Sequence, residues 1–296
     1  MNVIEVNNLS KAYGEVKAVD NISFTVEEGE LFAFLGVNGA GKSTTINMIC
    51  NITKPDSGEI KICGNDITSL EAKESIGVVF QGSVLDDRLT VLENLKSRAA
   101  CYNLTKDEIK ERIDYLIKLF DLNEILNRKY KTLSGGQRRR VDISRALIHN
   151  PKILFLDEPT TGLDPKSRIM VWNVIDELRK NANLTVFLTT HYMEETKDAN
   201  RVVIIDHGHI LVNDSPINLK EQYTKNYLKI YIEKNESIEA KFDKFEYKTN
   251  AYYIPFDKSE EVISFIEKNK DILTDFEVIK GDMDDVFLNV TGKELE

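Results

Sequence analysis

A glycine-rich segment near the N-terminus has residue types and spacing suited to holding phosphate. Residues 36–43 read Gly-Val-Asn-Gly-Ala-Gly-Lys-Ser and fit the pattern G-x-x-x-x-G-K-[ST]. Glycines let the backbone turn so that its N–H groups point at phosphate oxygens, and a following helix start adds a positive dipole end. Lys42 would reach the β and γ phosphates of a nucleotide, and the Ser43 hydroxyl would coordinate Mg²⁺. The remaining members of the expected phosphate-binding set are Gly36, Asn38, Gly39, Ala40, Gly41 and Thr44. A plain glycine turn between strand and helix is the alternative.

Two acidic residues, Asp157 and Glu158, follow a later apolar run at 153–156. A carboxylate at the C-terminal end of a strand faces the ligand crevice of an α/β sheet. We therefore expect Asp157 to hold Mg²⁺ through water, and Glu158 to orient the attacking water and accept its proton. Two acids that merely begin a surface loop are the alternative.

The elements that would position these residues are short apolar runs that alternate with amphipathic segments. Several of the runs are apolar on both faces, as in parallel strands buried beneath helices. This alternation predicts an α/β domain. The expected strands are 22–26, 31–35, 77–80, 153–156, 185–188 and 202–205, and the expected helices are 44–51, 106–119, 138–149 and 167–179.

The character of the chain changes after about Pro216. The following segment is dense in Lys and Glu, and Leu228, Ile230 and Ile232 alternate as on one face of a strand. Helices are expected at 259–268 and 284–290. The length of 296 residues suggests about two domains. We place a first domain at 1–218, with a helical subdomain at about 83–150, and a small α+β domain at 219–296.

The composition excludes several classes of protein. The chain has 39 basic and 49 acidic residues, a net charge of −10, which argues against a nucleic-acid coat or a polybasic membrane-surface protein. Three scattered cysteines make neither a disulfide framework nor a metal knuckle and fit a reduced, cytosolic setting. No apolar run approaches the roughly 20 residues that cross a bilayer.

Two short segments have ordinary structural interpretations. The basic run 138–140 is expected to be a solvated helix face with one arginine paired to an acid, and 207–209 is expected to be a turn between strands.

A third motif lies between the first two. Residues 133–137 read Leu-Ser-Gly-Gly-Gln and open the expected helix at 138–149. The order and spacing of this signature segment beside 36–43 and 157–158 closely resemble ATP-binding cassette (ABC) ATPases. The resemblance covers about residues 3–215. It implies an α/β P-loop cassette with a mixed sheet core, an antiparallel β subdomain and a helical insertion.

The resemblance also implies roles for further residues. Tyr13 would stack on adenine, Gln81 would sense Mg²⁺ and the water, and His191 would contact the γ phosphate. Asp164 belongs to a segment that crosses between subunits in the family. A second copy of the chain would close the far side of ATP, so that ATP joins two chains and hydrolysis releases them. The residues that would do so are Ser134, Gly135, Gly136 and Gln137.

By this resemblance the chain would use ATP and Mg²⁺ to energise separate integral membrane permease subunits, at the cytoplasmic face of the membrane. Residues 86–95 resemble the export branch, which suggests drugs, antimicrobial peptides or lipids as cargo, and the surface that couples to the permease would lie near 81–89. The tail, above all 284–293, resembles the accessory domain of bacterial drug and antimicrobial-peptide exporters.

Two other classes of function stay open. A non-transport ABC ATPase would act on ribosomes or DNA, although translation-type relatives usually carry two cassettes in one chain. DNA-repair relatives insert long coiled coils, whereas only 52 positions separate Gln81 from Leu133 here. A regulatory ATPase is the other alternative. No nucleic-acid partner is expected, and neither the cargo nor the role of the tail can be inferred.

Overall fold

The computed structural model describes residues 1–235, 239–270 and 273–292. It divides into two compact units, Met1–Asn213 and Asp214–Glu296, which are described separately. The division comes earlier than the expected boundary at residue 218. That boundary would cut helix α7 (Pro216–Tyr223), which belongs entirely to the second unit.

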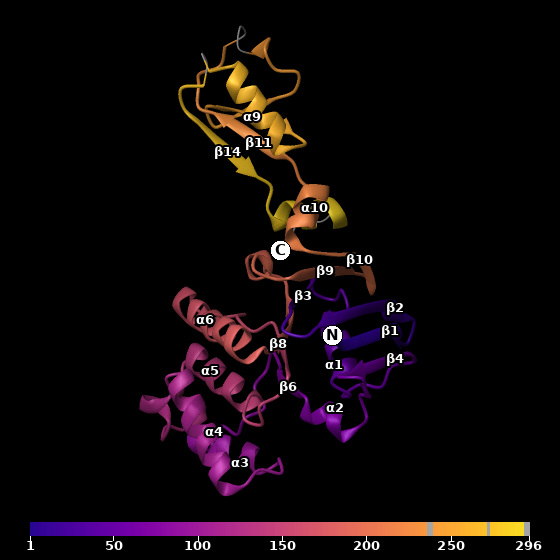
Figure 1. Ribbon diagram of the computed structural model, residues 1–296, viewed down its shortest axis with the longest axis vertical. Coiled ribbons are helices and arrows are strands. Elements are labelled where there is room, and N and C mark those ends of the chain that lie inside the picture. The colour runs from indigo at the N-terminus through magenta and orange to yellow at the C-terminus, as the bar shows by residue number, and fades with distance from the viewer. Residues whose placement is uncertain (236–238, 271–272, 293–296) are drawn as a thin grey trace. The chain divides into compact units, whose positions relative to one another are not determined.

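The first unit is built around a six-stranded sheet with the order β10-β9-β3-β8-β7-β6 (Figure 1). The strands from β9 to β6 pair in parallel. Every residue of β3, β7 and β8 is buried, which confirms the expectation from their apolar faces. The strands are β3 (Leu31–Leu35), β6 (Ile76–Val79), β7 (Ile153–Asp157), β8 (Thr185–Thr190), β9 (Arg201–Asp206) and β10 (His209–Asp214).

An antiparallel sheet with the order β2-β1-β4-β5 lies on one side of this sheet in Figure 1. The core includes a cluster of phenylalanine rings from β2, β3 and β8. The ring centroids of Phe24 and Phe32 are 5.4 Å apart, and those of Phe32 and Phe187 are 5.2 Å apart. Each buried ring contributes about 2 kcal/mol, so the cluster holds β3 firmly in place. The strands are β1 (Asn2–Tyr13), β2 (Val16–Glu27), β4 (Ser57–Ile62) and β5 (Asn65–Asp66).

Helices dominate the other side of the six-stranded sheet in Figure 1. The helix expected at 106–119 is confirmed with the same bounds, and its N-terminus carries a capping box between Thr105 and Glu108. Helix α5 starts earlier than expected, at Gly135, because Ser134 caps it. The helical elements of the first unit are α1 (Lys42–Ile49), α2 (Leu70–Glu74), α3 (Val91–Ala99), α4 (Lys106–Leu119), η1 (Asn123–Ile125), η2 (Tyr130–Thr132), α5 (Gly135–Ala146), α6 (Pro165–Ala182) and η3 (Met193–Thr196).

The second unit has its own antiparallel sheet with the order β12-β13-β11-β14. Leu228 and Ile230 lie in its core and Ile232 packs against them, as their alternation predicts. Of the tail segment 284–293, which resembles the accessory domain most strongly, residue 293 lies outside the described residues. The elements are α7, β11 (Asn226–Ile230), β12 (Glu246–Lys248), β13 (Ala251–Phe256), α9 (Ser259–Lys268), β14 (Phe276–Lys280) and α10 (Met283–Thr291).

Candidate active site

The phosphate loop follows β3 and is held by neighbouring backbone. A Cβ atom at Gly36 would lie 2.5 Å from the carbonyl oxygen of Ile205, so no larger residue fits there. Gly41 has a φ of 114°, a conformation that L side chains rarely adopt. The N–H of Gly208 donates to the Ala40 carbonyl at 3.0 Å. Gly208 belongs to the β9–β10 turn, so the expected turn is confirmed at 207–208 and supports the loop, while His209 begins β10.

The start of α1 leaves hydrogen-bond donors available to an anion. Gly41 occupies the N-cap position and provides no side-chain cap. The first N–H groups of a helix have no intrahelical acceptor, and they carry the positive end of the helix dipole. The N–H of Thr45 donates to the carbonyl oxygen of Gly41 at 2.9 Å. Ser43, in the first turn of this helix, is exposed. The geometry suits a phosphate group.

Lys42 is buried, with 4% of its surface exposed. Its Nζ atom donates to the carbonyl oxygens of Gly36 at 2.7 Å and Val37 at 3.1 Å, and lies 3.5 Å from Oε1 of Glu158. Burial lowers the pKa of Lys42, and the negative charges of Glu158 and Asp157 oppose that shift. The phosphate loop and the acids after β7 therefore share one buried site.

Strand β8 holds both acids through one residue. The hydroxyl of Thr189 donates to Oδ1 of Asp157 at 2.5 Å, and the Thr189 carbonyl accepts from the N–H of Glu158 at 3.0 Å. Glu158 has a φ of 46°, in the left-handed region that few non-glycine residues occupy. Such a conformation persists where the surroundings hold it, often at a functional position.

Side chains from separate parts of the chain converge on the carboxylate of Glu158. His191 Nδ1 lies 3.4 Å from Oε1. Gln81 Nε2 donates to Oε2 at 3.2 Å, and the Thr161 hydroxyl donates to the same oxygen at 3.4 Å. The structure thus brings together the four residues expected to act in catalysis, the fourth being Lys42.

The signature segment and Asp164 form a second group. Ser134 and Gln137 form a capping box at the start of α5, with Ser134 N–H donating to Gln137 Oε1 at 3.0 Å. A Cβ atom at Gly136 would overlap the side chain of Ser167. Asp164 in turn caps α6, accepting from the N–H of Ser167 at 3.0 Å. Helices α5 and α6 therefore approach each other closely at this point because Gly136 has no side chain.

The two groups are separate within one chain. Ser134 and Gly135 are exposed. In the part of the chain that the structure describes, no hydrogen bond or ion pair joins Ser134, Gly135 or Gly136 to the residues around Glu158. Tyr13 is the last residue of β1, with 53% of its surface exposed and Lys11 Nζ 5.6 Å from its ring centroid. Its ring is thus available to a ligand.

The residues expected to hold Mg²⁺ have suitable chemistry for that ion. Asp157, Ser43 and Gln81 offer carboxylate, hydroxyl and amide oxygens, which are the hard donors that Mg²⁺ prefers. No group of three His, Cys, Asp or Glu side chains among the described residues could hold a metal. A set with few protein ligands fits Mg²⁺, which is usually shared with phosphate oxygens and water.

The expectation for the basic run 138–140 is only partly right. Arg140 Nη1 lies 3.8 Å from Oδ2 of Asp121, so one arginine is paired to an acid. Arg139, however, is only 7% exposed and faces the acidic strand end. The residue types alone do not indicate that Arg139 is buried. The helical period is a signal for it, because Arg139 lies three residues after Gly136 and so shares its face, which is buried.

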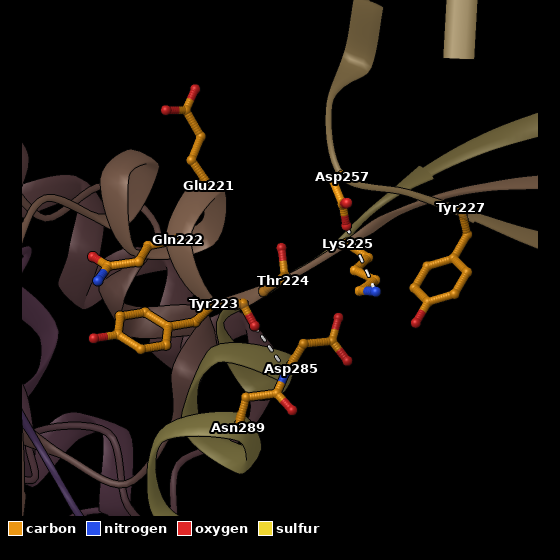
Figure 2. A pocket seen from close by; sticks show the side chains of 9 residues that line it. All are labelled: Glu221, Gln222, Tyr223, Thr224, Lys225, Tyr227, Asp257, Asp285 and Asn289. Atoms are coloured by element: carbon orange, nitrogen blue, oxygen red, sulfur yellow. Dashed lines mark hydrogen bonds and ion pairs between the residues drawn. The ribbon is translucent and has the colours of Figure 1, made fainter. Parts of the chain in front are cut away.

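The second unit contains an open cavity of about 500 Å³. Figure 2 shows its lining, where Lys225 Nζ lies 3.6 Å from Oδ1 of Asp257 and Asn289 donates to the carbonyl of Tyr223 at 2.8 Å. None of the expected site residues lines this cavity.

Comparisons with known proteins agree with this site. The profile of the family described as "ABC transporter" matches residues 19–161. The chain is 39% identical to the daunorubicin/doxorubicin resistance ATP-binding protein DrrA of Streptomyces peucetius, over 79% of this chain and 72% of that one. It is 32% identical to the Nod factor export ATP-binding protein I of Cupriavidus metallidurans, over 99% of this chain and 98% of that one.

Solved structures give the same result. The structure of cbiO1 from Clostridium perfringens, part of the ABC transporter complex cbiONQ, matches with a TM-score of 0.67 and 30% identity, over 74% of this chain and 90% of that one. The ATP-binding cassette MJ0796, solved as a dimer bound to ADP and Pi, matches with a TM-score of 0.66 and 31% identity, over 72% and 98% of the two chains.

None of the helices within residues 1–235, 239–270 and 273–292 has the length and apolar character to span a membrane. The nucleotide-site geometry and the likeness to relatives over most of their length lead to one assignment. The chain belongs to the ATP-binding cassette (ABC) transporter family, as one of its ATP-binding and ATP-hydrolysing proteins.

Proposed function

We propose that Glu158 is the general base for ATP hydrolysis. It accepts a proton as water attacks the γ phosphorus, the bond to the β–γ bridging oxygen breaks, and ADP and phosphate leave. The contacts of Gln81 and His191 with the Glu158 carboxylate support roles in orienting the water and the γ phosphate. Asp157 and Ser43 would hold Mg²⁺, which would reduce the negative charge on the phosphates. Catalysis then depends on positioning and charge stabilisation.

We propose further that two copies of the chain enclose ATP. The supporting observation is that, within the residues that the structure describes, the exposed Ser134 and Gly135 have no polar contact with those around Glu158. The start of α5 offers helix N–H groups to an anion, as the start of α1 does. A second copy would bring its signature segment to the γ phosphate held by the first. The dimeric structure of MJ0796 supports this arrangement.

The partner of this dimer would be a pair of integral membrane permease subunits, which the cassette energises from the cytoplasmic face of the membrane. The observation that carries this proposal is the likeness to a Nod factor export protein along nearly the whole of both chains, second unit included. The cargo would be a drug, an antimicrobial peptide or a lipid. The drug-resistance name of DrrA is in keeping with that range.

The loop near 81–89 would be the surface that meets the permease. It is mostly exposed, and it includes Val84, an apolar side chain with 60% of its surface exposed. An exposed apolar residue three positions after Gln81 is suited to a protein contact that also reaches the catalytic group. Leu70, at the start of α2, is 65% exposed and provides a matched control elsewhere on the same unit.

The test is purification of the tagged chain from salt-washed, detergent-solubilised native membranes, followed by mass spectrometry. We expect a stoichiometric partner with several membrane spans. Val84→Asp should remove this partner and leave ATP hydrolysis by the free chain unchanged, whereas Leu70→Asp should keep the partner. Recovery only with ribosomes, DNA or soluble proteins would reject the transport role and leave the ATPase assignment intact.

A further inference from the structure

A single buried guanidinium contacts the ends of two neighbouring strands of the site. Among the described residues, Arg139 on α5 donates only to backbone carbonyl oxygens. Its acceptors are Phe80 at 2.7 Å, Asp157 at 3.1 Å, Glu158 at 2.9 Å and Pro159 at 2.5 Å. The first acceptor follows β6 and the other three end or follow β7. Arg139 therefore spans the gap between the two strand ends.

These contacts bear directly on the reacting groups. Phe80 directly precedes Gln81, and Glu158 is itself one of the acceptors. The left-handed φ of Glu158 costs free energy, so its backbone needs external support to stay in place. Hydrogen bonds from a charged donor are roughly twice as strong as neutral ones. Arg139 thus supplies support at the residue whose carboxylate accepts from Gln81 at 3.2 Å.

Helix α5 also holds the chain on the far side of Gln81. Asp142, one turn after Arg139, accepts from the hydroxyl of Ser83 at 2.6 Å and from that of Tyr130 at 2.9 Å. Asp142 and Tyr130 are both buried. Gln81 is therefore flanked by two residues, Phe80 and Ser83, that are each bonded to α5. The same helix begins with the signature segment.

We propose that Arg139 is a positioning residue for ATP hydrolysis, which holds the backbone of Glu158 and Gln81 in the arrangement that activates water. The inference rests on the proposed role of Glu158. Arg139 acts through Glu158 and Gln81, because its donors are directed at backbone carbonyls, and its effect is on the rate of the chemical step. The planar guanidinium presents five N–H donors in a fixed fork. The ammonium of a lysine cannot reach all four carbonyls from one position.

The test compares steady-state ATP hydrolysis by the full chain with Arg139→Gln, Arg139→Lys, Arg140→Gln and Glu158→Gln. Arg140 is the matched control, because its guanidinium donates to the carbonyls of Phe120 and Asp121, away from the site. We expect Arg139→Gln to lower kcat at least about tenfold with the KM for ATP changed less than about twofold, since ground-state binding is intact. Arg140→Gln should change neither beyond about twofold.

Arg139→Lys keeps the buried positive charge. If Arg139→Gln fails to fold, the kcat of Arg139→Lys alone tests the role of Arg139. Its kcat should lie between those of wild type and Arg139→Gln. Wild-type kcat in either folded Arg139 variant, or a proportionate rise in KM, would overturn the inference. Turnover retained by Glu158→Gln would instead reject the proposed base. A lower kcat in Glu158→Gln together with an unchanged kcat in the Arg139 variants would reject only the role of Arg139.

Discussion

The ammonium nitrogen of Lys42 lies 3.5 Å from a carboxylate oxygen of Glu158, and both side chains are almost fully buried. The two residues come from the phosphate loop and from the end of β7, far apart in the sequence. Each charge compensates the other in a site of low solvent access, where an unpaired charge would be costly. Their proposed roles nevertheless differ, because Lys42 would bind phosphate and Glu158 would activate water.

Substitutions at these two residues should therefore have different effects. Glu158→Gln keeps the size of the side chain and removes its basicity, so turnover should fall by a factor of about 10²–10⁴ while ATP still binds. Size-exclusion chromatography of this variant with ATP should show a trapped dimer. Lys42→Ala should instead weaken the binding of a fluorescent ATP analogue. A Glu158→Gln protein that stays monomeric with ATP and retains turnover would show that the assignment of Glu158 is wrong.

Removal of Mg²⁺ with EDTA should stop ATP hydrolysis, because the negative charge on the phosphates would lack its counter-ion. Ser43→Ala should raise the Mg²⁺ concentration needed for half-maximal turnover by about tenfold or more, since one oxygen ligand is lost. Thr45→Ala is the matched control, because the Thr45 hydroxyl is buried and donates to the Gly41 carbonyl at 2.9 Å. An equal shift in the two variants would exclude a specific role for Ser43.

The adjacent glycines of the signature segment should respond differently to alanine. A Cβ atom at Gly136 would overlap Ser167, so Gly136→Ala should lower the free energy of unfolding by about 1–3 kcal/mol. At Gly135 the nearest atom would be Leu163 Cδ2 at 3.8 Å, an ordinary contact, so stability should be retained. Urea denaturation measures both values. Gly135→Ala should still reduce turnover if the residue faces ATP held by a second copy, and normal turnover would argue against that interface.

His149 should make the protein less stable in mild acid. Its ring stacks on Tyr102 at 4.0 Å, and burial lowers its pKa from 6.5 to about 4, with Arg98, Arg112 and Arg145 adding to the shift. Between these pH values the unfolded chain binds a proton at His149 that the folded chain does not, so stability falls as the pH decreases from 6.5 to about 4.

The loss between about pH 7 and about pH 5 should be on the order of 1–2 kcal/mol, and urea denaturation of wild type and His149→Gln at each pH measures it. The variant should lack this part of the pH dependence. His207→Gln, altered at a side chain that is 80% exposed on a turn, controls for the loss of a histidine. Identical pH dependence in wild type and His149→Gln would contradict the prediction.

Most of the fold could be predicted because its signals are local. The buried strands β3 and β7 show as continuous apolar runs, and the apolar stripe of α4 gave its bounds correctly. The start of α5 was placed too late, because Gly135 and Gly136 have low helix propensity and the cap at Ser134 outweighs it. The burial of Arg139 was missed because a run of three arginines is more often solvated, although the helical period places Arg139 on the same face as Gly136.

The sequence by itself determined which chemistry this protein carries. The phosphate loop, the two acids after a buried strand and the signature segment are short patterns whose spacing depends on local backbone geometry. The tertiary structure decided which of these residues meet. Parallel pairing places β6, β7 and β8 side by side, so that Gln81, Glu158 and His191 converge at one sheet edge. It also places Ser134 at the start of α5, where the described residues show no polar contact between Ser134 and that edge.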